Sequence, residues 1–308
     1  VYSERFIEAH GGKKGQAAIY GQELSATTRK LACMNLAIRG IDYDMGQSHG
    51  DTFHNDQHPD LRADYVLANP PFNIKGWGAD KLPKDPRWKY GVPPDGNANY
   101  AWLQHMLARL SAEGRAGIVL ANGSMTTNTG GEGDIRTAMI KGDVVECMVA
   151  LPGQLFANTP IPACLWFLSH NKGAGKNGKR DRRKQVLFID ARKLSSLIPG
   201  SRKQKELSEA EIRQIAQTYQ NWRGTEWGEG TYEDVPGFCK SATLAEIEQH
   251  GYALTPGRYV GATDIEDDDD TFDEQMANLT SELSVLFGRG SDLEAEVREQ
   301  LGRIGYAV

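Results

Sequence analysis

The segment ADYVLANPPFNIKGWG (Ala63–Gly78) joins an apolar run to a motif that cannot extend it. The run Ala63–Ala68 predicts a strand of the kind that is buried on both faces of a parallel sheet. Two consecutive prolines follow soon after it, and each fixes φ and lacks the N–H that a strand would need. The segment therefore predicts a strand that ends at Ala68 and, directly after it, a rigid motif made of Asn69, Pro70, Pro71 and Phe72.

Strands and helices alternate on both sides of this segment. Apolar runs predict strands at 17–23, 115–121 and 143–152, and helical spacing predicts helices at 25–40, 98–114 and 133–142. The runs 161–170 and 184–192 follow each other with no helix between them, which indicates an antiparallel hairpin at the sheet edge. We therefore expect an α/β fold with a doubly wound, mostly parallel sheet and an antiparallel terminal hairpin.

The chain changes character near residue 194. A helix over 207–224, begun by Ser208, precedes a Pro/Gly-rich extended element at 251–260. An acidic run at 264–270 and two helical stretches, 272–287 and 292–304, follow. We expect two parts: a catalytic core over 1–193 and a helical, partner-binding extension over 194–308.

Bulk composition excludes several classes of protein. The 308 residues carry a net charge of -6, so overall electrostatics would not drive nucleic-acid binding, and any such contact needs a local basic patch or a partner. Four cysteines lie far apart with no CxxC pair, which argues against a zinc site and a disulfide framework. No run suits a signal peptide or a membrane span. We expect a soluble, cytoplasmic protein without a metal.

The Asn-Pro-Pro-Phe motif is suited to hold an amino group. In an α/β sheet, ligands bind outside the carboxyl ends of the strands, where Asn69 is expected. The Asn69 amide oxygen and the Pro70 carbonyl could accept both hydrogens of an exocyclic amine, while Phe72 stacks on its ring. Positioning would then supply much of the rate without a strongly shifted acid or base. The alternative is a strand-ending turn with Phe72 buried for packing.

The same four residues resemble the catalytic motif of S-adenosylmethionine-dependent amino-methyltransferases, chiefly those that make N6-methyladenine in DNA. The blocks GDTF, GNANYAWLQHML, GRAGIVLANGSM and GYALTPGRYV resemble more narrowly the modification (methyltransferase) subunit of type I restriction–modification systems. The resemblance implies a Rossmann-like fold, S-adenosylmethionine as cofactor, and transfer to adenine N6 of a flipped base.

Further residues follow from the resemblance. Glu23 is similar to the acidic residue that binds the cofactor ribose hydroxyls, and Leu24 would pack on the cofactor adenine. Asp51 resembles the acceptor for the adenine amine, with Thr52 or Phe53 beside it. Phe156 is a candidate second aromatic for the flipped base, and the alternative is a core phenylalanine.

The resemblance also implies partners. These are double-stranded DNA, a specificity subunit, a second methyltransferase subunit and, in complexes that cleave DNA, restriction subunits. The segment 171–184 carries seven basic residues and one acid and could contact phosphates, although a solvated hairpin loop is the alternative. The segment 73–99 could order around a flipped adenine.

One feature that the resemblance implies is missing: no glycine-rich loop for the methionine part of the cofactor precedes Glu23. We expect the chain to be the C-terminal part of a longer subunit, to bind S-adenosylmethionine weakly by itself, and to leave two strand edges unpaired. Two other functions stay open. The chain could be an Asn-Pro-Pro-aromatic methyltransferase that acts on protein glutamine or RNA guanine, or an inactive fragment for DNA binding and assembly.

Overall fold

The computed structural model describes residues 2–261, apart from 14, 158, 177 and 202, and the isolated positions Thr280, Ser284, Phe287 and Gly290. The chain divides into two units, Val1–Gly261 and Ala262–Val308, and the fold given below is that of the first. The acidic run at 264–270 and, apart from those isolated positions, the expected helices at 272–287 and 292–304 lie outside the described residues.

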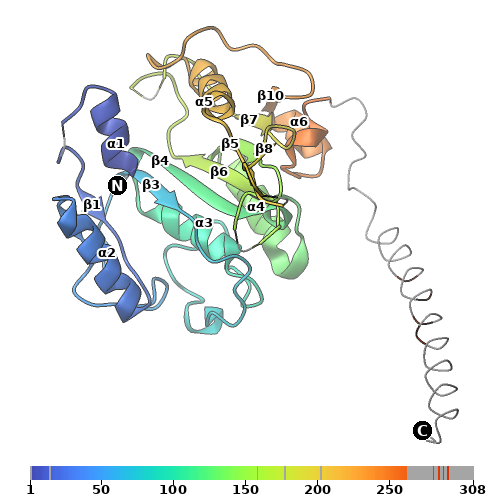
Figure 1. The fold of residues 1–308 in the computed structure, drawn as a ribbon. Helices are drawn as coiled ribbons and strands as arrows, with labels where there is room; N and C mark the ends of the chain where they lie inside the picture. The colour runs from blue at the N-terminus through green and yellow to red at the C-terminus, as the bar shows by residue number, and fades with distance from the viewer. Residues whose placement is uncertain are drawn as a thin grey trace, which may run out of the picture. The chain divides into compact units, whose positions relative to one another are not determined.

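A six-stranded sheet forms the centre of the first unit (Figure 1). Strand pairs β3/β4 and β5/β7 are parallel, whereas β6 runs antiparallel to both of its neighbours and β10 runs antiparallel to β7. In spatial order the strands are β10 (Cys239–Thr243), β7 (Gln185–Asp190), β5 (Val145–Ala150), β6 (Ala163–Ser169), β4 (Leu110–Ala121) and β3 (Ala63–Ala68).

The expected α/β class is confirmed, but the sheet is mixed rather than mostly parallel. The expected hairpin between 161–170 and 184–192 is wrong, because β5 lies between β6 and β7. Strand β6 is buried along most of its length and pairs with β4 on one side and β5 on the other. A strand with apolar residues on both faces gains most at such a central position, where both of its edges are hydrogen-bonded.

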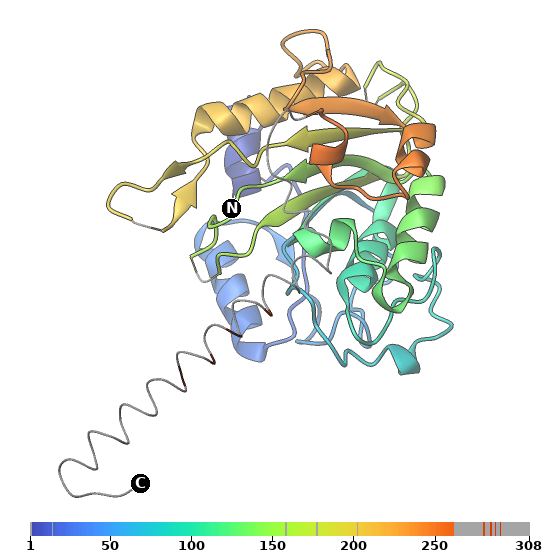
Figure 2. The ribbon, with the colours of Figure 1, turned by 90° about the vertical axis from the view of Figure 1, so that its right-hand side faces the viewer.

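Helices cover both faces of the sheet (Figure 2). On one face, α3 (Asn99–Ala108), α4 (Glu132–Lys141) and α6 (Leu244–Gln249) pack on a core with strand residues such as Ile118 and Trp166. On the other face, α5 (Glu209–Arg223) packs Trp222 against β5 and β7. As predicted, Ser208 caps α5, in a capping box with Glu211.

The N-terminal region is separate from the large sheet. It contains α1 (Tyr2–Ala9), α2 (Ala26–Ile38) and a two-stranded parallel sheet of β1 (Ile19–Tyr20) and β2 (Tyr43–Asp44). Within the described ranges β1 pairs only with β2, and β3 pairs only with β4, so the predicted unpaired edges are present. Tyr65 and Leu67, which share one face of β3, are 75% and 76% exposed, so the expected burial on both faces is wrong.

Two further segments differ from expectation. The helix predicted to reach Gly114 ends at Ala108, and β4 begins at Leu110, where it pairs with β3. The element at 251–260 is not extended; it contains a 3-10 turn, and Tyr259 stacks on Phe188 at 3.8 Å. Strand β10 belongs to the same sheet as the strands before residue 193, and α5 packs on that sheet. The expected division at 193 therefore stays a prediction about function.

The remaining short elements are η1 (Ala79–Lys81), η2 (Asn122–Met125), η3 (Thr129–Gly131), β8 (Ser196–Leu197), β9 (Lys205–Glu206) and η4 (Pro256–Arg258).

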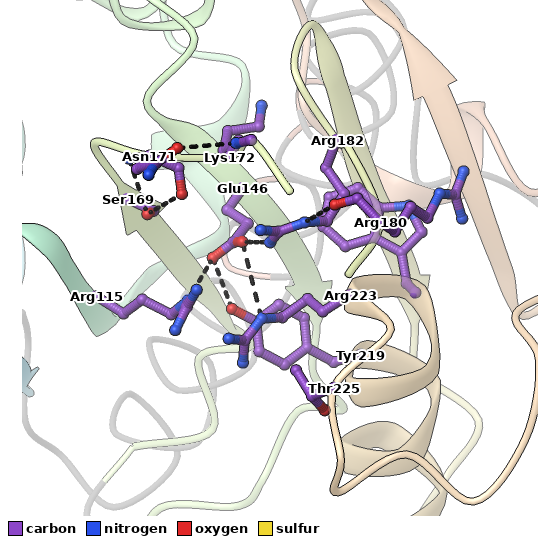
Figure 3. Close-up of polar contacts among 12 residues, drawn as sticks. Arg115, Glu146, Ser169, Asn171, Lys172, Arg180, Arg182, Tyr219, Arg223 and Thr225 are labelled. Atoms are coloured by element: carbon purple, nitrogen blue, oxygen red, sulfur yellow. Dashed lines mark hydrogen bonds and ion pairs between the residues drawn. The ribbon is translucent and has the colours of Figure 1, made fainter. Parts of the chain in front are cut away.

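A buried ionic cluster attaches α5 to the sheet (Figure 3). Its centre is Glu146, which is fully buried at an irregularity of β5 between Val145 and Cys147. The Glu146 carboxylate contacts Arg182, lies 3.3 Å from Arg115 Nε, and accepts a 2.7 Å hydrogen bond from the Tyr219 hydroxyl. Burial and the nearby carboxylate raise the pKa of Tyr219 well above its ordinary value, so the phenol stays a donor.

Candidate functional site

The Asn-Pro-Pro-Phe motif lies at the carboxyl edge of the sheet. Ala68, the last residue of β3, is in register with Ile118 of the parallel strand β4. Asn69 follows at once with an exposed side chain, Pro70 is buried, and Phe72 is half-buried against the core. The motif therefore combines a fixed backbone with a free amide, at the edge where α/β sheets bind ligands.

A reciprocal amide pair fixes the backbone just after the motif. Asn73 has a φ of 55°, a left-handed conformation that few residues other than glycine adopt. Asn99, 1% exposed at the start of α3, accepts a 3.0 Å hydrogen bond from the Asn73 N–H. It also donates to Asn73 Oδ1 at 2.8 Å. Asn99 was not among the residues predicted from the sequence; its signal is the asparagine pair in GNANY.

The structure brings Phe156 to the motif. Phe156 follows the carboxyl end of β5, and its ring meets that of Phe72 edge-on, with 6.3 Å between centroids. Edge-to-face contact at this separation is a favourable aromatic geometry. The two rings therefore line the same edge of the sheet as Asn69. Contact with a base stays a prediction for both.

The structure also brings Glu23 and Asp51 together. The Gly50 N–H donates to the Glu23 carbonyl at 3.0 Å. The Gln22 side chain, next to Glu23, adds contacts to the carbonyls of Gly50 and Asn55. Strand β1 ends at Tyr20, so Glu23 lies in the turn beyond it rather than at the end of a strand.

These residues fit the adenosine part of S-adenosylmethionine. Glu23 and Asp51 offer carboxylate acceptors for hydroxyls and an amine, Thr52 is half-buried beside them, and Leu24 presents a 69% exposed apolar side chain. Asp51 itself is oriented: its Oδ1 accepts from the Phe53 N–H at 2.8 Å, and its Oδ2 lies 3.2 Å from His54 Nδ1.

The segment that follows the motif is packed. Trp77 and Trp88 are buried, and their rings lie 4.8 Å and 6.3 Å from the ring of Phe53. Their indole N–H groups donate to the carbonyls of Pro94 and Leu82, both at 2.9 Å. The tryptophans of 73–99 therefore form a small core around Phe53, and ordering of this segment around a flipped adenine stays a prediction.

The basic segment 171–184 lies at the end of the strands opposite to the Asn-Pro-Pro-Phe motif. Strand β6 ends at Ser169, which is in register with Arg115, whereas the other end of β4 is near Asn69. Arg115 is also in register with Tyr65, and the four residue steps from Tyr65 to Asn69 span roughly 13 Å. Lys172 and Arg182 are moreover buried; Lys172 Nζ donates to the carbonyls of Val145 and Gln185. Phosphate contact by this segment beside a flipped base is not supported by its position.

Within the described part of the chain, no group of three or more His, Cys, Asp or Glu side chains is arranged to hold a metal ion. Among the helices that the structure describes, none is both long enough and apolar enough to cross a membrane.

Comparison with known sequences gives a consistent result. A family model described as N-6 DNA Methylase matches residues 1–268. The HindI type I restriction enzyme methylase subunit of Haemophilus influenzae is 50% identical, over 99% of this chain and 66% of its own length. The MjaIX type I methylase subunit of Methanocaldococcus jannaschii is 39% identical, over 97% and 52%. The chain thus spans less than two thirds of each relative.

Solved structures agree on the fold. A type I restriction–modification methyltransferase subunit from Streptococcus thermophilus superposes with a TM-score of 0.68 and 29% identity, covering 80% of this chain and 49% of that one. The EcoKI M protein superposes with a TM-score of 0.61 over 94% and 60%, and at 18% identity it supports the fold alone.

Proposed function

The chain belongs to the N-6 DNA methylase family, and from this premise we propose that it is the catalytic part of a type I modification subunit. In this proposal the subunit transfers a methyl group from S-adenosylmethionine to N6 of an adenine that is flipped out of double-stranded DNA. The observation that carries the proposal is the exposed Asn69 amide beside the Phe72–Phe156 pair, at the carboxyl edge of the sheet.

Asn69 and Pro70 would hold the amine. The Asn69 side-chain oxygen and the Pro70 carbonyl each accept one N6 hydrogen, which directs the nitrogen lone pair at the methyl donor. Pro71 keeps the turn rigid, and Phe72 and Phe156 contact the base through their rings. The chain would thus accelerate transfer by orientation, with no protein group changing its protonation state first.

Glu23, Leu24, Asp51 and Thr52 would hold the adenosine part of the cofactor. Glu23 accepts hydrogen bonds from the ribose hydroxyls, Asp51 accepts one from the adenine amine with Thr52 beside it, and Leu24 packs on the adenine ring. When bound, S-adenosylmethionine supplies a methyl group activated by its positively charged sulfur.

The proposed partners are inferred from the relatives of this chain. The relatives are named as methylase subunits of type I restriction enzymes. We infer that this chain acts in the cytoplasm with a specificity subunit, a second methyltransferase subunit and, for cleavage, restriction subunits. Residues 194–308 are the proposed partner-binding part.

A transfer assay tests the substrate class. The assembled complex, supplied with S-adenosylmethionine labelled in the methyl group, is expected to label duplex DNA and to leave RNA and protein unlabelled. DNA first methylated to completion with unlabelled cofactor should accept no label. Label in RNA guanine or protein glutamine, with none in DNA, would contradict the proposed function.

A further inference from the structure

Arg87 joins the two halves of the proposed site. We call residues 50–57 the cofactor loop and residues 73–98 the target segment. Arg87 belongs to the target segment and is only 8% exposed, yet its guanidinium reaches the cofactor loop. Nη1 donates to the Thr52 carbonyl at 3.0 Å, and Nη2 donates to the Phe53 carbonyl at 2.5 Å.

All five N–H groups of this guanidinium have partners. Besides the two carbonyls, Nε and Nη2 donate to the two oxygens of Asp85 at 2.8 Å and 2.7 Å. Nη1 also lies 3.0 Å from His105 Nδ1 on α3. Only the planar, five-donor arginine can make this set of contacts; a lysine has three donors at one point.

The pKa values of two neighbours of Arg87, His105 and Asp85, are both lowered, which keeps these side chains hydrogen-bond acceptors. Burial lowers the pKa of His105 to about 4, and the nearby positive charge of Arg87 adds to this effect. The neutral imidazole can therefore accept a hydrogen bond from Arg87. Burial alone would raise the pKa of Asp85, but its hydrogen bonds from Arg87 lower it. The neutral imidazole and the ionised carboxylate are therefore both acceptors for the guanidinium of Arg87.

A second link joins the same two segments independently. The imidazole of His54, in the cofactor loop, lies 3.2 Å from Asp51 Oδ2 through one nitrogen and 3.2 Å from the Gly78 carbonyl through the other. His54 is partly exposed, so replacing it disturbs no core. The orientation of Asp51 therefore depends on the target segment through a side chain other than Arg87.

We propose that Arg87 is a positioning residue for the cofactor: by holding the carbonyls of Thr52 and Phe53, it sets the geometry in which Asp51 and Thr52 meet the adenosine. The inference rests on the proposed function and adds to it. The affinity for S-adenosylmethionine is then controlled from the segment that follows the catalytic motif.

The test measures cofactor affinity in the assembled complex. Arg87→Lys should raise the dissociation constant of S-adenosylhomocysteine roughly 10- to 100-fold, because charge-assisted hydrogen bonds to the loop are lost. The KM for S-adenosylmethionine should rise in parallel, while kcat at saturating cofactor changes little. A purely structural role would lower the amount of active complex and leave both constants unchanged.

Arg183→Lys is the matched control. Arg183 makes the same Asp-x-Arg contacts, with its backbone N–H and guanidinium bound to Asp181, but it is exposed and lies at the opposite edge of the sheet. Its replacement should leave cofactor affinity unchanged.

His54→Ala keeps the inference testable if Arg87→Lys does not fold, since it should weaken cofactor binding several-fold. Wild-type affinity in Arg87→Lys, or in His54→Ala where Arg87→Lys does not fold, would overturn this inference alone. A wild-type complex that binds no S-adenosylhomocysteine would overturn the proposed function, and this inference with it.

Discussion

Replacement of Asn69 by alanine is expected to lower the rate of adenine methylation by roughly 10²- to 10³-fold in the assembled complex. The variant loses the acceptor that the side chain offers to one N6 hydrogen, so the amine is no longer oriented. The Asn69 side chain is exposed, and its removal leaves no cavity. Assembly and cofactor binding should therefore stay at wild-type levels. The rate is measured in single turnover with saturating DNA and cofactor.

Asn69→Asp is the informative companion. Aspartate keeps acceptor oxygens at the same position, so this variant should retain more activity than Asn69→Ala despite its added charge. If Asn69→Ala methylates at the wild-type rate, the role assigned to the motif is wrong. If both variants lose activity together with assembly, the asparagine serves folding instead.

The second large effect concerns stability. Glu146→Ala should lower the free energy of unfolding by roughly 3 to 5 kcal/mol, because it leaves buried arginines without their shared carboxylate. Arg182 is fully buried, and Arg115 and Arg223 are nearly so. The unfolding free energy is measured by urea denaturation.

Two further variants provide a scale for this loss of unfolding free energy. Tyr219→Phe removes a single hydrogen bond to Glu146 and should cost about 1 to 2 kcal/mol. Glu229→Ala breaks an exposed pair with Arg213 and should change stability by less than about 1 kcal/mol. A Glu146→Ala protein as stable as Glu229→Ala would show that α5 is attached by apolar packing alone.

The ends of elements that depend on neighbouring residues were predicted correctly from the sequence. Two prolines stop a strand, and β3 ends at Ala68 as predicted. Ser25 and Ser208 offer hydroxyl caps, and helices begin at the next residue in both cases. The place of the candidate site was likewise predictable, because a strand end fixes where Asn69 lies.

The pairing of strands that lie far apart in the sequence could not be predicted from such local signals. The residues near Leu110 and Ser111 form the end of a helix by propensity, but pairing of β4 with β3 makes them a strand. The position of β6 between β4 and β5 depends on which neighbours offer free edges, and adjacent segments in the sequence wrongly suggest a hairpin.

Several buried polar side chains could not be predicted from the sequence either. Arg87, Asn99 and Glu146 are polar and would ordinarily be assigned to the surface, yet all three are buried with their partners. Their partners come from other elements: Arg87 meets the cofactor loop, Asn99 meets Asn73, and Glu146 meets α5. Such pairs depend on the fold and carry no fixed spacing in sequence.

The most direct test of the central claim is the identity of the methylated nucleoside. Duplex DNA labelled by the assembled complex is digested, and its nucleosides are separated and identified by mass spectrometry. We predict that the label is found in N6-methyl-2′-deoxyadenosine and that its initial rate of formation falls roughly 10²- to 10³-fold when Asn69 is replaced by alanine. Label in a methylated cytosine, or in N6-methyladenine at wild-type level with the Asn69→Ala complex, would contradict the account.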